Sequence, residues 1–489
     1  MAPHIHYTKL FINNEWVDSK SGKTFDTYNP HDGSVIAKVS EGDKEDIDLA
    51  VAAAKKAFAR NSEWRLMDPS ERGKILYRFA DLVEKEANYL AQLESYNNGM
   101  VLHMNTMLMT GAPDEIRYTA SLADKIEGNT IPSDGDTFCY TLKQPVGVCG
   151  LILPWNVPIL MFLKKVTTAL AAGCTTVVKP AEQTPLTALY LASLLQKAGV
   201  PPGVVNVVNG YGETAGVALT HHPDVAKISF TGSLEVGKLI QQAAGANNLK
   251  RITLELGGKS PLVIMNDADL AAAIPYAAFG VFTHQGQICI AASRLYVQSG
   301  IYDQFVKGAV EMAKNYKIGN PFDADTQHGP QIDEGMMKKV LGYIEKGKQE
   351  GAKLLVGGKQ SGSKGYYIEP TVFADVQDDM TIAKEEIFGP VQSILKFETL
   401  EEVIDRANAT NYGLAAGIFT TNVNTAAIQF SKNVEAGIVW VNTYMKMCTQ
   451  APFGGFKESG IGREGGQRCV DEYLEVKTVT MAVPKKISN

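Results

Sequence analysis

The chain has 489 residues, of which 45% are hydrophobic and 20% are charged, with a net charge of -6 at pH 7. This length predicts two or three domains, and the composition is typical of a globular protein. Because there is no surplus of basic residues, nucleic acid is excluded as the main partner. No run of 18 apolar residues occurs, so we expect no membrane-spanning segment.

The six cysteines form no C-x-x-C pair and show no Cys/His spacing typical of metal ligands. This pattern predicts free thiols in a reducing compartment, without a disulfide framework or a metal site. The N-terminal segment 1–7 has neither the apolar core of a signal peptide nor an Arg- and Ser-rich transit pattern. We therefore expect a cytoplasmic location, although a chain whose targeting peptide had been removed would look the same.

The N-terminal part predicts a β-hairpin followed by helices. Asn13 and Asn14 lie between two short apolar runs, which is typical of a hairpin turn. Asp43 precedes an apolar pattern of helical spacing and is suited to cap it. Helical spacing predicts three helices in this part of the chain, at 43–58, 70–86 and 100–123.

Between residues 146 and 265, apolar runs typical of strands alternate with segments of helical spacing. The predicted strands cover 146–153, 174–179, 204–208, 227–230 and 252–256. The predicted helices cover 159–171, 185–198, 212–220 and 234–247. Because the strand runs are almost continuously apolar, both faces of their sheet must be covered. The pattern predicts a doubly wound parallel α/β domain of the Rossmann type.

After residue 265 the alternation starts again, which predicts a second α/β domain. Its predicted helices cover 269–285, 301–316, 334–350 and 400–409, and its strands include 294–298 and segments near Leu354, Val391 and Val439. Residues 128–146 predict a β-hairpin that stands apart from its helical surroundings, and residues 473–483 predict a late strand. A detached hairpin has unpaired edges, so we expect an oligomerisation element, with a simple surface excursion as the alternative.

Segments with polar, charged or glycine residues follow four of the predicted parallel strands. Ligands of open parallel sheets bind beyond such strand ends. Glu182, with Lys179 beside it, could accept hydrogen bonds from both ribose hydroxyls, which favours NAD over NADP. Gly232 and Gly237 bracket a helix start, where backbone amides favour a pyrophosphate. Their G-x-x-x-x-G spacing also fits an ordinary helix entry turn.

Cys289 lies in the segment Gly286–Arg294, between a helical pattern and a predicted strand. A thiol at such a junction can project into a cleft while the flanking elements fix its backbone. The alternative is a buried small hydrophobic residue without chemistry, which is the commoner role of a free cysteine.

Seven motifs, taken together in this order, resemble the NAD(P)-dependent aldehyde dehydrogenase superfamily, and within it the cytosolic, mitochondrial and retinal-type branch. The resemblance covers essentially the whole chain. The motifs are Pro154-Trp155-Asn156, Lys179-Pro-Ala-Glu182, Phe230-Thr-Gly-Ser233, Glu255-Leu-Gly-Gly-Lys259, Gly286-Gln-Ile-Cys289, Glu385-Glu386-Ile-Phe388-Gly-Pro390 and Pro452-Phe-Gly-Gly455.

The resemblance implies a domain division and an assembly. An NAD-binding domain would comprise 1–126 and 146–257, and a catalytic domain would comprise 258–457. An oligomerisation element would comprise 127–145 and 458–489. The branch implies a homotetramer, a dimer of dimers. Arg251, Arg463 and Glu475 resemble an ion-pair group that links the subunit interface to the active site.

The resemblance also implies residue roles. Cys289 would attack the aldehyde as a thiolate, and Asn156 with the Cys289 backbone N–H would hold the oxyanion. Glu255 would activate water to hydrolyse the thioester, with Lys165 behind it. NAD would be held by Leu153, Trp155, Asn156, Lys179, Glu182, Gly212, Gly232, Ser233, Gly237, Leu256, Lys339, Glu386 and Phe388.

Departures from the family pattern concentrate in the expected substrate tunnel, where relatives commonly have aromatic residues. The tunnel residues would be Val157, Met161, Lys164, Thr283, Met447 and Phe453, of which Phe453 stays aromatic. Lys164 and Lys446 suggest an anionic or polar aldehyde, unless both extend to solvent. Met336 replaces a glutamine that touches the cofactor in many relatives, so cofactor affinity could differ.

Two alternatives to an NAD-dependent aldehyde oxidation remain open from the sequence. Members of this branch also serve as lens crystallins, structural proteins in which catalysis has faded. The altered tunnel and Met336 are compatible with that role, whereas the intact Cys289, Glu255 and Asn156 argue against it. Esterase action by the same thiolate would be a side activity. The sequence does not identify the preferred aldehyde or decide between dimer and tetramer.

Overall fold

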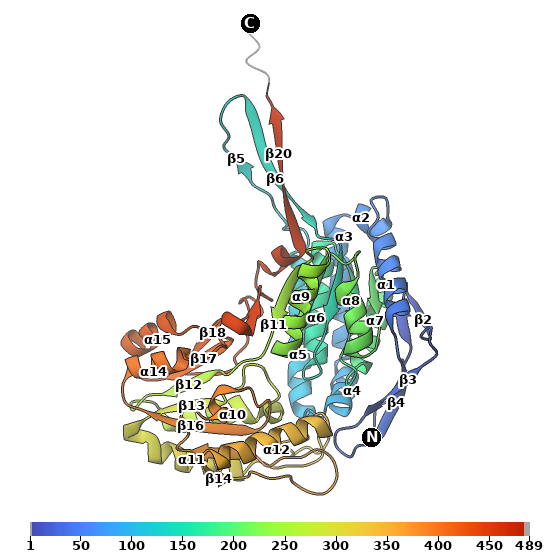
Figure 1. Cartoon of the computed structure of the whole chain (residues 1–489). Coiled ribbons are helices and arrows are strands. Elements are labelled where there is room, and N and C mark those ends of the chain that lie inside the picture. Colours follow the sequence, from blue (N-terminus) through green and yellow to red (C-terminus); the bar gives the residue numbers. More distant parts are fainter. Residues whose placement is uncertain (1, 484–489) are drawn as a thin grey trace.

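The computed structural model describes residues 2–483, which form two large mixed sheets, a three-stranded arm and a small two-stranded sheet (Figure 1). The first large sheet has the order β19-β11-β10-β7-β8-β9-β1-β2. Its strands are β1 (Leu10–Ile12), β2 (Glu15–Val17), β7 (Val148–Ile152), β8 (Thr175–Lys179), β9 (Val205–Val207), β10 (Lys227–Thr231), β11 (Arg251–Glu255) and β19 (Gly460–Ile461). The five central strands are parallel, which confirms the predicted doubly wound sheet.

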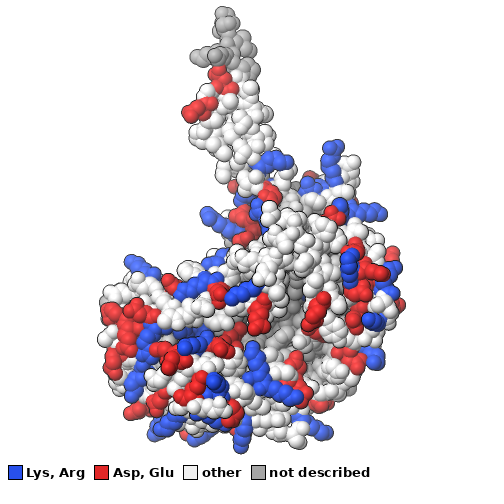
Figure 2. Space-filling model, viewed as in Figure 1, with Lys and Arg blue, Asp and Glu red and all other residues white. Residues whose placement is uncertain are grey.

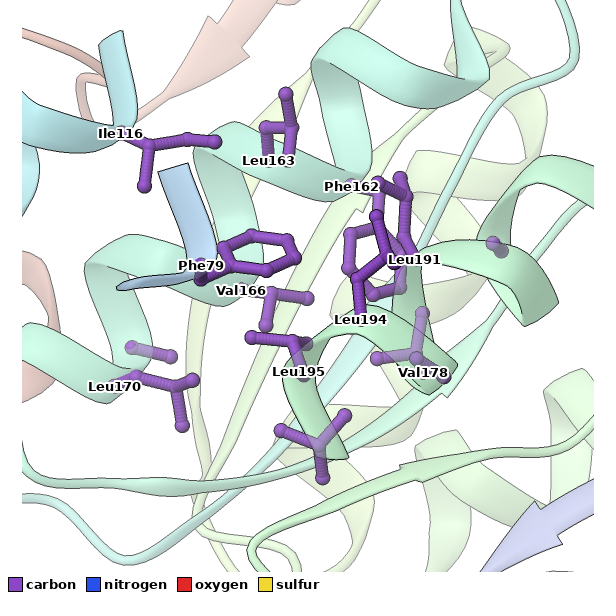
Figure 3. Packing of buried hydrophobic residues seen from close by; sticks show 14 of the residues in the cluster. Phe79, Ile116, Phe162, Leu163, Val166, Leu170, Val178, Leu191, Leu194 and Leu195 are labelled. Atoms are coloured by element: carbon purple, nitrogen blue, oxygen red, sulfur yellow. The ribbon is translucent and has the colours of Figure 1, made fainter. Parts of the chain in front are cut away.

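Helices cover both faces of this sheet because successive strand residues point to opposite sides. Leu151 and Val178 belong to one apolar cluster, and Val148 and Val177 belong to another. Figure 3 shows the first cluster, in which Phe79, Phe162 and Leu191 from three helices pack together. The helices on that face are α3 (Pro69–Lys85), α6 (Pro158–Ala172) and α7 (Leu186–Ala198), and those on the other are α1 (Lys44–Ala57), α8 (Val217–His221) and α9 (Leu234–Ala246).

The second large sheet has the order β14-β15-β16-β13-β12-β17-β18 and is parallel except at β14. Its strands are β12 (Pro261–Ile264), β13 (Arg294–Gln298), β14 (Lys353–Val356), β15 (Thr371–Ala374), β16 (Val391–Phe397), β17 (Ala415–Phe419) and β18 (Ile438–Val441). Its helices are α10 (Leu270–Phe282), α11 (Tyr302–Lys314), α12 (Glu334–Gln349), α13 (Thr381–Lys384), α14 (Leu400–Asn408) and α15 (Ile428–Asn433). The predicted second α/β unit is therefore present.

The arm projects from the body of the molecule at the upper end of the first sheet (Figure 1). It consists of β5 (Thr130–Ile131), β6 (Thr137–Pro145) and β20 (Leu474–Ala482), in the order β20-β6-β5. β20 pairs antiparallel with β6 along its whole length, so the C-terminal strand completes the predicted hairpin. Figure 2 shows charges of both signs over the body and few charges on the visible face of the arm.

Helix boundaries lie where local sequence signals predict them. The helices and strands that the sequence did not predict lack a clear hydrophobic period. Asp43 caps α1 through a capping box with Asp46, as its position predicts. The sequence pattern did not reveal α4 (Ala87–Asn98), which precedes α5 (Leu102–Ser121), because α4 buries polar residues such as Glu94 and Asn98. Short elements without a clear period were also missed: α2 (Glu63–Leu66), β3 (Thr24–Tyr28), β4 (Val35–Ser40), β12, β15, β17 and α15.

All six cysteines are free thiols, as their spacing predicts. Within residues 2–483, no helix combines the length and the apolar character needed to cross a membrane. The same residues contain no cluster of three or more His, Cys, Asp or Glu side chains placed to hold a metal ion.

Candidate active site

The central strands of the first sheet are parallel, so the polar and charged residues that follow them lie at one edge of this sheet. Along the chain, β7, β8 and β9 follow one another in one direction, whereas β10 and β11 lie on the other side of β7. The strand order therefore reverses between β7 and β10, and such a switch point leaves a crevice suited to a dinucleotide. Asn156 follows β7, and Glu255 ends β11, so both residues lie at this edge.

Cys289 lies in a loop that leads from α10 to β13, as the sequence indicated. Gly286 has φ of +74°, and a Cβ there would lie 2.0 Å from the Gly389 carbonyl oxygen, so this turn requires glycine. The buried Gln287 side chain accepts a hydrogen bond from Ile332 N at 2.9 Å, and Tyr444 donates to the Ile290 carbonyl at 2.9 Å. These contacts fix the backbone on both sides of Cys289.

Glu255 lies close enough to the Cys289 thiol for each group to shift the pKa of the other. Burial raises the pKa of Glu255 to about 7, and the negative charge of Glu464 adds to this shift. Burial and the Glu255 carboxylate raise the pKa of Cys289 well above its usual value. The thiol is therefore protonated at neutral pH, and Glu255 is the neighbouring base that can accept its proton.

Two hydrogen bonds fix Asn156, and they leave one N–H of its side-chain amide available. Its Nδ2 donates to the Gln287 carbonyl at 2.8 Å, and its backbone carbonyl accepts from Asn98 Nδ2 at 3.0 Å. Since a side-chain amide has two N–H donors, the second donor can serve an oxygen close to Cys289. The contact with Gln287 ties Asn156 directly to the cysteine loop.

Lys165 is almost completely buried and has two partners. Its Nζ donates to Ser229 Oγ at 3.0 Å and forms an ion pair with Glu464. Burial opposes ionisation of Glu464, but the charge of Lys165 outweighs it and lowers the Glu464 pKa. The sequence reasoning placed Lys165 behind Glu255 but missed Glu464, which arrives from a loop near the C-terminus and carried no recognised motif.

The expected pyrophosphate and adenosine-ribose residues lie at the ends of β8 and β10. Lys179 Nζ is buried and donates to Glu182 Oε2 at 3.1 Å, while the Glu182 carboxylate remains partly exposed. Ser233 caps α9 and accepts from Val236 N. A Cβ on Gly237 would lie 2.7 Å from Leu256 Cδ2, so this glycine lets α9 approach the end of β11 closely.

A second set of expected cofactor residues lies where the two large sheets meet. Glu386 accepts from Gly258 N at 3.0 Å, and a Cβ on Gly257 would lie 2.2 Å from a Glu386 carboxylate oxygen. Phe388 has φ of +59° and packs edge-on against Trp155 with ring centroids 5.3 Å apart. Glu386 and Phe388, both between α13 and β16 of the second sheet, thus contact residues that follow strands of the first sheet.

Other expected cofactor residues differ in exposure. Gly212 and Lys339 are exposed, and the charge of Lys339 is close enough to lower the pKa of Glu386, which burial raises overall. Leu153 and Leu256 are buried, so their backbone or their packing is what they can offer a ligand. Met336 is half-buried in the first turn of α12.

The expected tunnel residues fall into apolar and charged groups. Phe453 and Cys289 belong to the same apolar cluster, and Lys164 Nζ lies over the Phe453 ring, 5.3 Å from its centroid. Val157, Met161 and Thr283 are partly or fully buried, whereas Met447 is 48% exposed. Lys164 also pairs with Glu115 of α5, a residue that the sequence reasoning missed because no family motif includes it.

The structure separates the expected interface ion pairs. Arg251 forms an ion pair with Glu475 of β20, and both side chains are about half exposed. The Arg463 guanidinium instead donates to the carbonyls of Gly455 and Gly462. Within residues 2–483, Arg463 has no ion pair with Glu475, so the three residues do not form one group in a single chain.

A model of the aldehyde dehydrogenase family matches residues 16–479. The chain belongs to the aldehyde dehydrogenase family. It is 57% identical over 485 residues to aldehyde dehydrogenase 1A1 of Mesocricetus auratus, covering 99% of this chain and 97% of that protein. It is 56% identical to aldehyde dehydrogenase, cytosolic 1 of Rattus norvegicus, with the same coverage. An NAD⁺ complex of aldehyde dehydrogenase from Bacillus cereus matches with a TM-score of 0.96 and 47% identity, covering 98% of this chain and 97% of that chain.

These matches confirm the resemblance and the branch that the motifs indicated, and this protein is an aldehyde dehydrogenase. The crystallin alternative is not favoured. Asn156, which follows β7, bonds the loop that carries Cys289, and Glu255 at the end of β11 lies beside the thiol, so the residues expected for catalysis are intact and adjacent.

Proposed function

We propose that this enzyme oxidises an aldehyde to its carboxylic acid with NAD⁺, through covalent intermediates on Cys289. The observation that carries the proposal is the placement of Cys289 beside Glu255 and Asn156, at the carboxyl edge of the first sheet. A nucleophile, a base of pKa about 7 and a free amide donor are the three groups that acyl transfer through a thiol requires.

The crevice suits NAD⁺ on grounds that this chain itself supplies. Glu182 is a partly exposed carboxylate positioned by Lys179, and an acceptor of this kind binds both ribose hydroxyls but repels a 2′-phosphate. Gly237 brings the start of α9 to the strand ends, where its amides favour a pyrophosphate. Glu386 is positioned to accept from the second ribose. NAD⁺, when bound, supplies the hydride acceptor.

The first steps use Cys289, Glu255 and Asn156. Glu255 takes the thiol proton, and the sulfur forms a bond to the aldehyde carbon. The carbonyl oxygen becomes an oxyanion, which accepts hydrogen bonds from the second Asn156 N–H and the Cys289 backbone N–H. One such donor contributes about 3–4 kcal/mol of transition-state stabilisation. Loss of hydride from the same carbon leaves a thioester on Cys289.

Glu255 also acts in the release of the product. After it has released the thiol proton to solvent, its carboxylate takes a proton from water, and the hydroxide adds to the thioester carbon. The carbon–sulfur bond then breaks, which frees the carboxylic acid, and Glu255 returns its proton to the sulfur to restore the Cys289 thiol. Burial is the main cause that brings the Glu255 pKa near neutrality, and the two charges of the Lys165–Glu464 pair adjust it in opposite directions.

Replacement of the nucleophile tests this proposal most directly. We expect Cys289→Ala to lower NADH formation from a simple aldehyde by more than about 10³-fold, because the covalent route is lost. The matched control is Cys469→Ala, which removes a buried thiol outside the crevice and should keep most of the activity. Substantial NADH formation by Cys289→Ala would contradict the mechanism.

We further propose that the arm joins four copies of the chain into a dimer of dimers. Val476 and Met481 of β20 and Phe138 and Leu142 of β6 are exposed apolar side chains. Among the described residues, the outer edges of β20 and β5 pair with no strand, and such edges favour association. Light scattering coupled to size exclusion tests this proposal: a mass of four chains supports it, and a mass of one chain contradicts it.

We also propose a cytoplasmic location. The rat relative, which is 56% identical, is named as a cytosolic enzyme. Imaging of the tagged full-length chain in its cells of origin would test the location, and accumulation within an organelle would contradict it.

A further inference from the structure

Lys164 and Glu115 form a shielded ion pair beside the reactive residues. Lys164 lies on α6, directly before Lys165, and its Nζ is 3.8 Å from Glu115 Oε1 on α5. Each of the two side chains is only 15% exposed. Charged side chains are rarely buried unless their charges are compensated, and desolvating them is costly. A shielded pair at this place therefore requires an explanation.

The Lys164 ammonium lacks hydrogen-bond acceptors. The 3.8 Å separation from Glu115 exceeds hydrogen-bond length, and Nζ otherwise lies over the ring of Phe453. Among residues 2–483, no acceptor lies within hydrogen-bonding distance of this nitrogen. The neighbouring Lys165, in contrast, bonds both Ser229 and Glu464. Lys164 thus presents up to three N–H donors that the protein does not use.

Charged groups of both signs lie around Lys164. Lys165 and Glu464 compensate each other, and burial raises the pKa of both Glu255 and Glu115 toward their neutral forms. Burial opposes the charge of Lys164, but the neighbouring carboxylates, Glu115 foremost, and the Cys289 thiol raise its pKa. Lys164 in turn lowers the pKa of Cys289 against the opposing effects of burial and Glu255. The ammonium is therefore ionised and close to the nucleophile.

The surface next to Phe453 is also positive. Phe453 lines a hollow of about 410 Å³, to which Lys446, Met447 and Arg463 contribute. No carboxylate occurs among the described residues that line this hollow. Phe453 thus lies under the Lys164 ammonium and also lines a hollow to which only cations, Lys446 and Arg463, contribute charge among the described residues.

We propose that the preferred substrates are aldehydes that carry a carboxylate a few carbons from the carbonyl, and that Lys164 binds this carboxylate. The proposal rests on the aldehyde oxidation proposed above. The carboxylate would accept charge-assisted hydrogen bonds from Nζ, which the 3.8 Å contact with Glu115 leaves available. An apolar aldehyde would instead press against an ammonium that is left unpaired, which weakens its binding. Lys164 is thus a specificity-determining residue.

Steady-state kinetics with matched aldehydes test this proposal. We expect the wild-type enzyme to use succinic semialdehyde with a kcat/KM about 10- to 100-fold above that for butanal, which has the same carbon chain without the charge. Lys164→Met should remove this preference by lowering kcat/KM for the semialdehyde while keeping or raising it for butanal. Lys164→Arg should retain part of the preference. Lys74→Met, which breaks the exposed Lys74–Glu71 pair, is the matched control.

The outcomes separate this inference from the proposed reaction. If the wild type oxidises butanal at least as efficiently as the semialdehyde, the inference is overturned and the reaction stands. If Lys164→Met lowers both values equally and shifts the pH profile, Lys164 only tunes Cys289, and the inference also fails. If neither aldehyde yields NADH, the proposed function fails, and the alkylation experiment below still decides the role of Lys164.

Alkylation of Cys289 needs no cofactor and no turnover. Iodoacetate and iodoacetamide react with the same sulfur and differ in charge, and mass spectrometry of the Cys289 peptide gives both rates. We expect the iodoacetate-to-iodoacetamide ratio to fall about tenfold or more in Lys164→Met and to stay unchanged in Lys74→Met. An unchanged ratio in Lys164→Met overturns the proposal. Equal melting temperatures of the variants and the wild type show that the fold is intact.

Discussion

The two sides of Cys289 are built in different ways. On the side proposed to bind the cofactor, the missing side chains of Gly237 and Gly257 let α9 and Glu386 both approach the end of β11 closely. The substrate side consists of side chains from distant segments, including Glu115, Lys164 and Phe453. Close backbone packing thus shapes much of the first side, whereas side chains from distant segments shape the second.

In the proposed mechanism Asn156 stabilises the oxyanion of every substrate, so its loss should affect every aldehyde. We expect Asn156→Ala to lower kcat by about 10²- to 10³-fold for semialdehyde and butanal alike, because one oxyanion donor is lost. This uniform loss contrasts with the selective loss expected for Lys164→Met. Since Asn156 also holds Gln287, the melting temperature should be measured beside kcat. A loss confined to one aldehyde would assign Asn156 to the substrate side.

The fold and the cofactor side were largely predictable from sequence because their signals are local. The five parallel strands stand out as apolar runs, and the Lys179–Glu182 pair lies within one motif. The cap at Asp43 likewise depends only on neighbouring residues. The doubly wound sheet follows from that alternation, and the structure confirms it.

The substrate side was not predictable to the same extent, because its residues meet only in the folded chain. Glu115 on α5 pairs with Lys164 on α6, and the arm hairpin separates these two helices in the sequence. No spacing rule connects the two residues. Glu464 meets Lys165 in the same way, from a loop almost 300 residues later in the chain. The one local sign was the pair of adjacent lysines in a helix that carries no other charged residue. α4 was missed for a related reason, since its buried polar residues hide the helical pattern.

Two glycines on α9 allow the cofactor side to be tested alone. A Cβ at Gly237 would lie 2.7 Å from the buried Leu256 side chain, whereas a Cβ at Gly245 would meet no atom within 4 Å. We expect Gly237→Ala to cost about 1–3 kcal/mol of unfolding free energy through overpacking. It should also weaken NAD⁺ binding, because α9 must move away from β11.

The matched substitution Gly245→Ala should be neutral or stabilise the enzyme by up to about 1 kcal/mol, as expected for alanine in a helix. Denaturant unfolding and NAD⁺ titration of both variants provide the measurement. Neither variant should change the ratio of kcat/KM values for semialdehyde and butanal. A changed ratio in Gly237→Ala would show that the two sides of Cys289 are not independent.

The smallest expected effect concerns Glu255, the proposed base in both thiol attack and thioester hydrolysis. Glu255 acts as a base only when it is ionised, so the rate of thioester hydrolysis should rise with pH through its pKa of about 7 and level off above it. The negative charge of Glu464 raises this pKa. Glu464→Gln removes that charge and leaves Lys165 uncompensated, and both changes favour the Glu255 carboxylate. The midpoint should therefore move to lower pH, by about one unit or less. Deacylation after reaction with p-nitrophenyl acetate measures this step without cofactor, and a midpoint that rises or stays constant would show that Glu464 does not control Glu255.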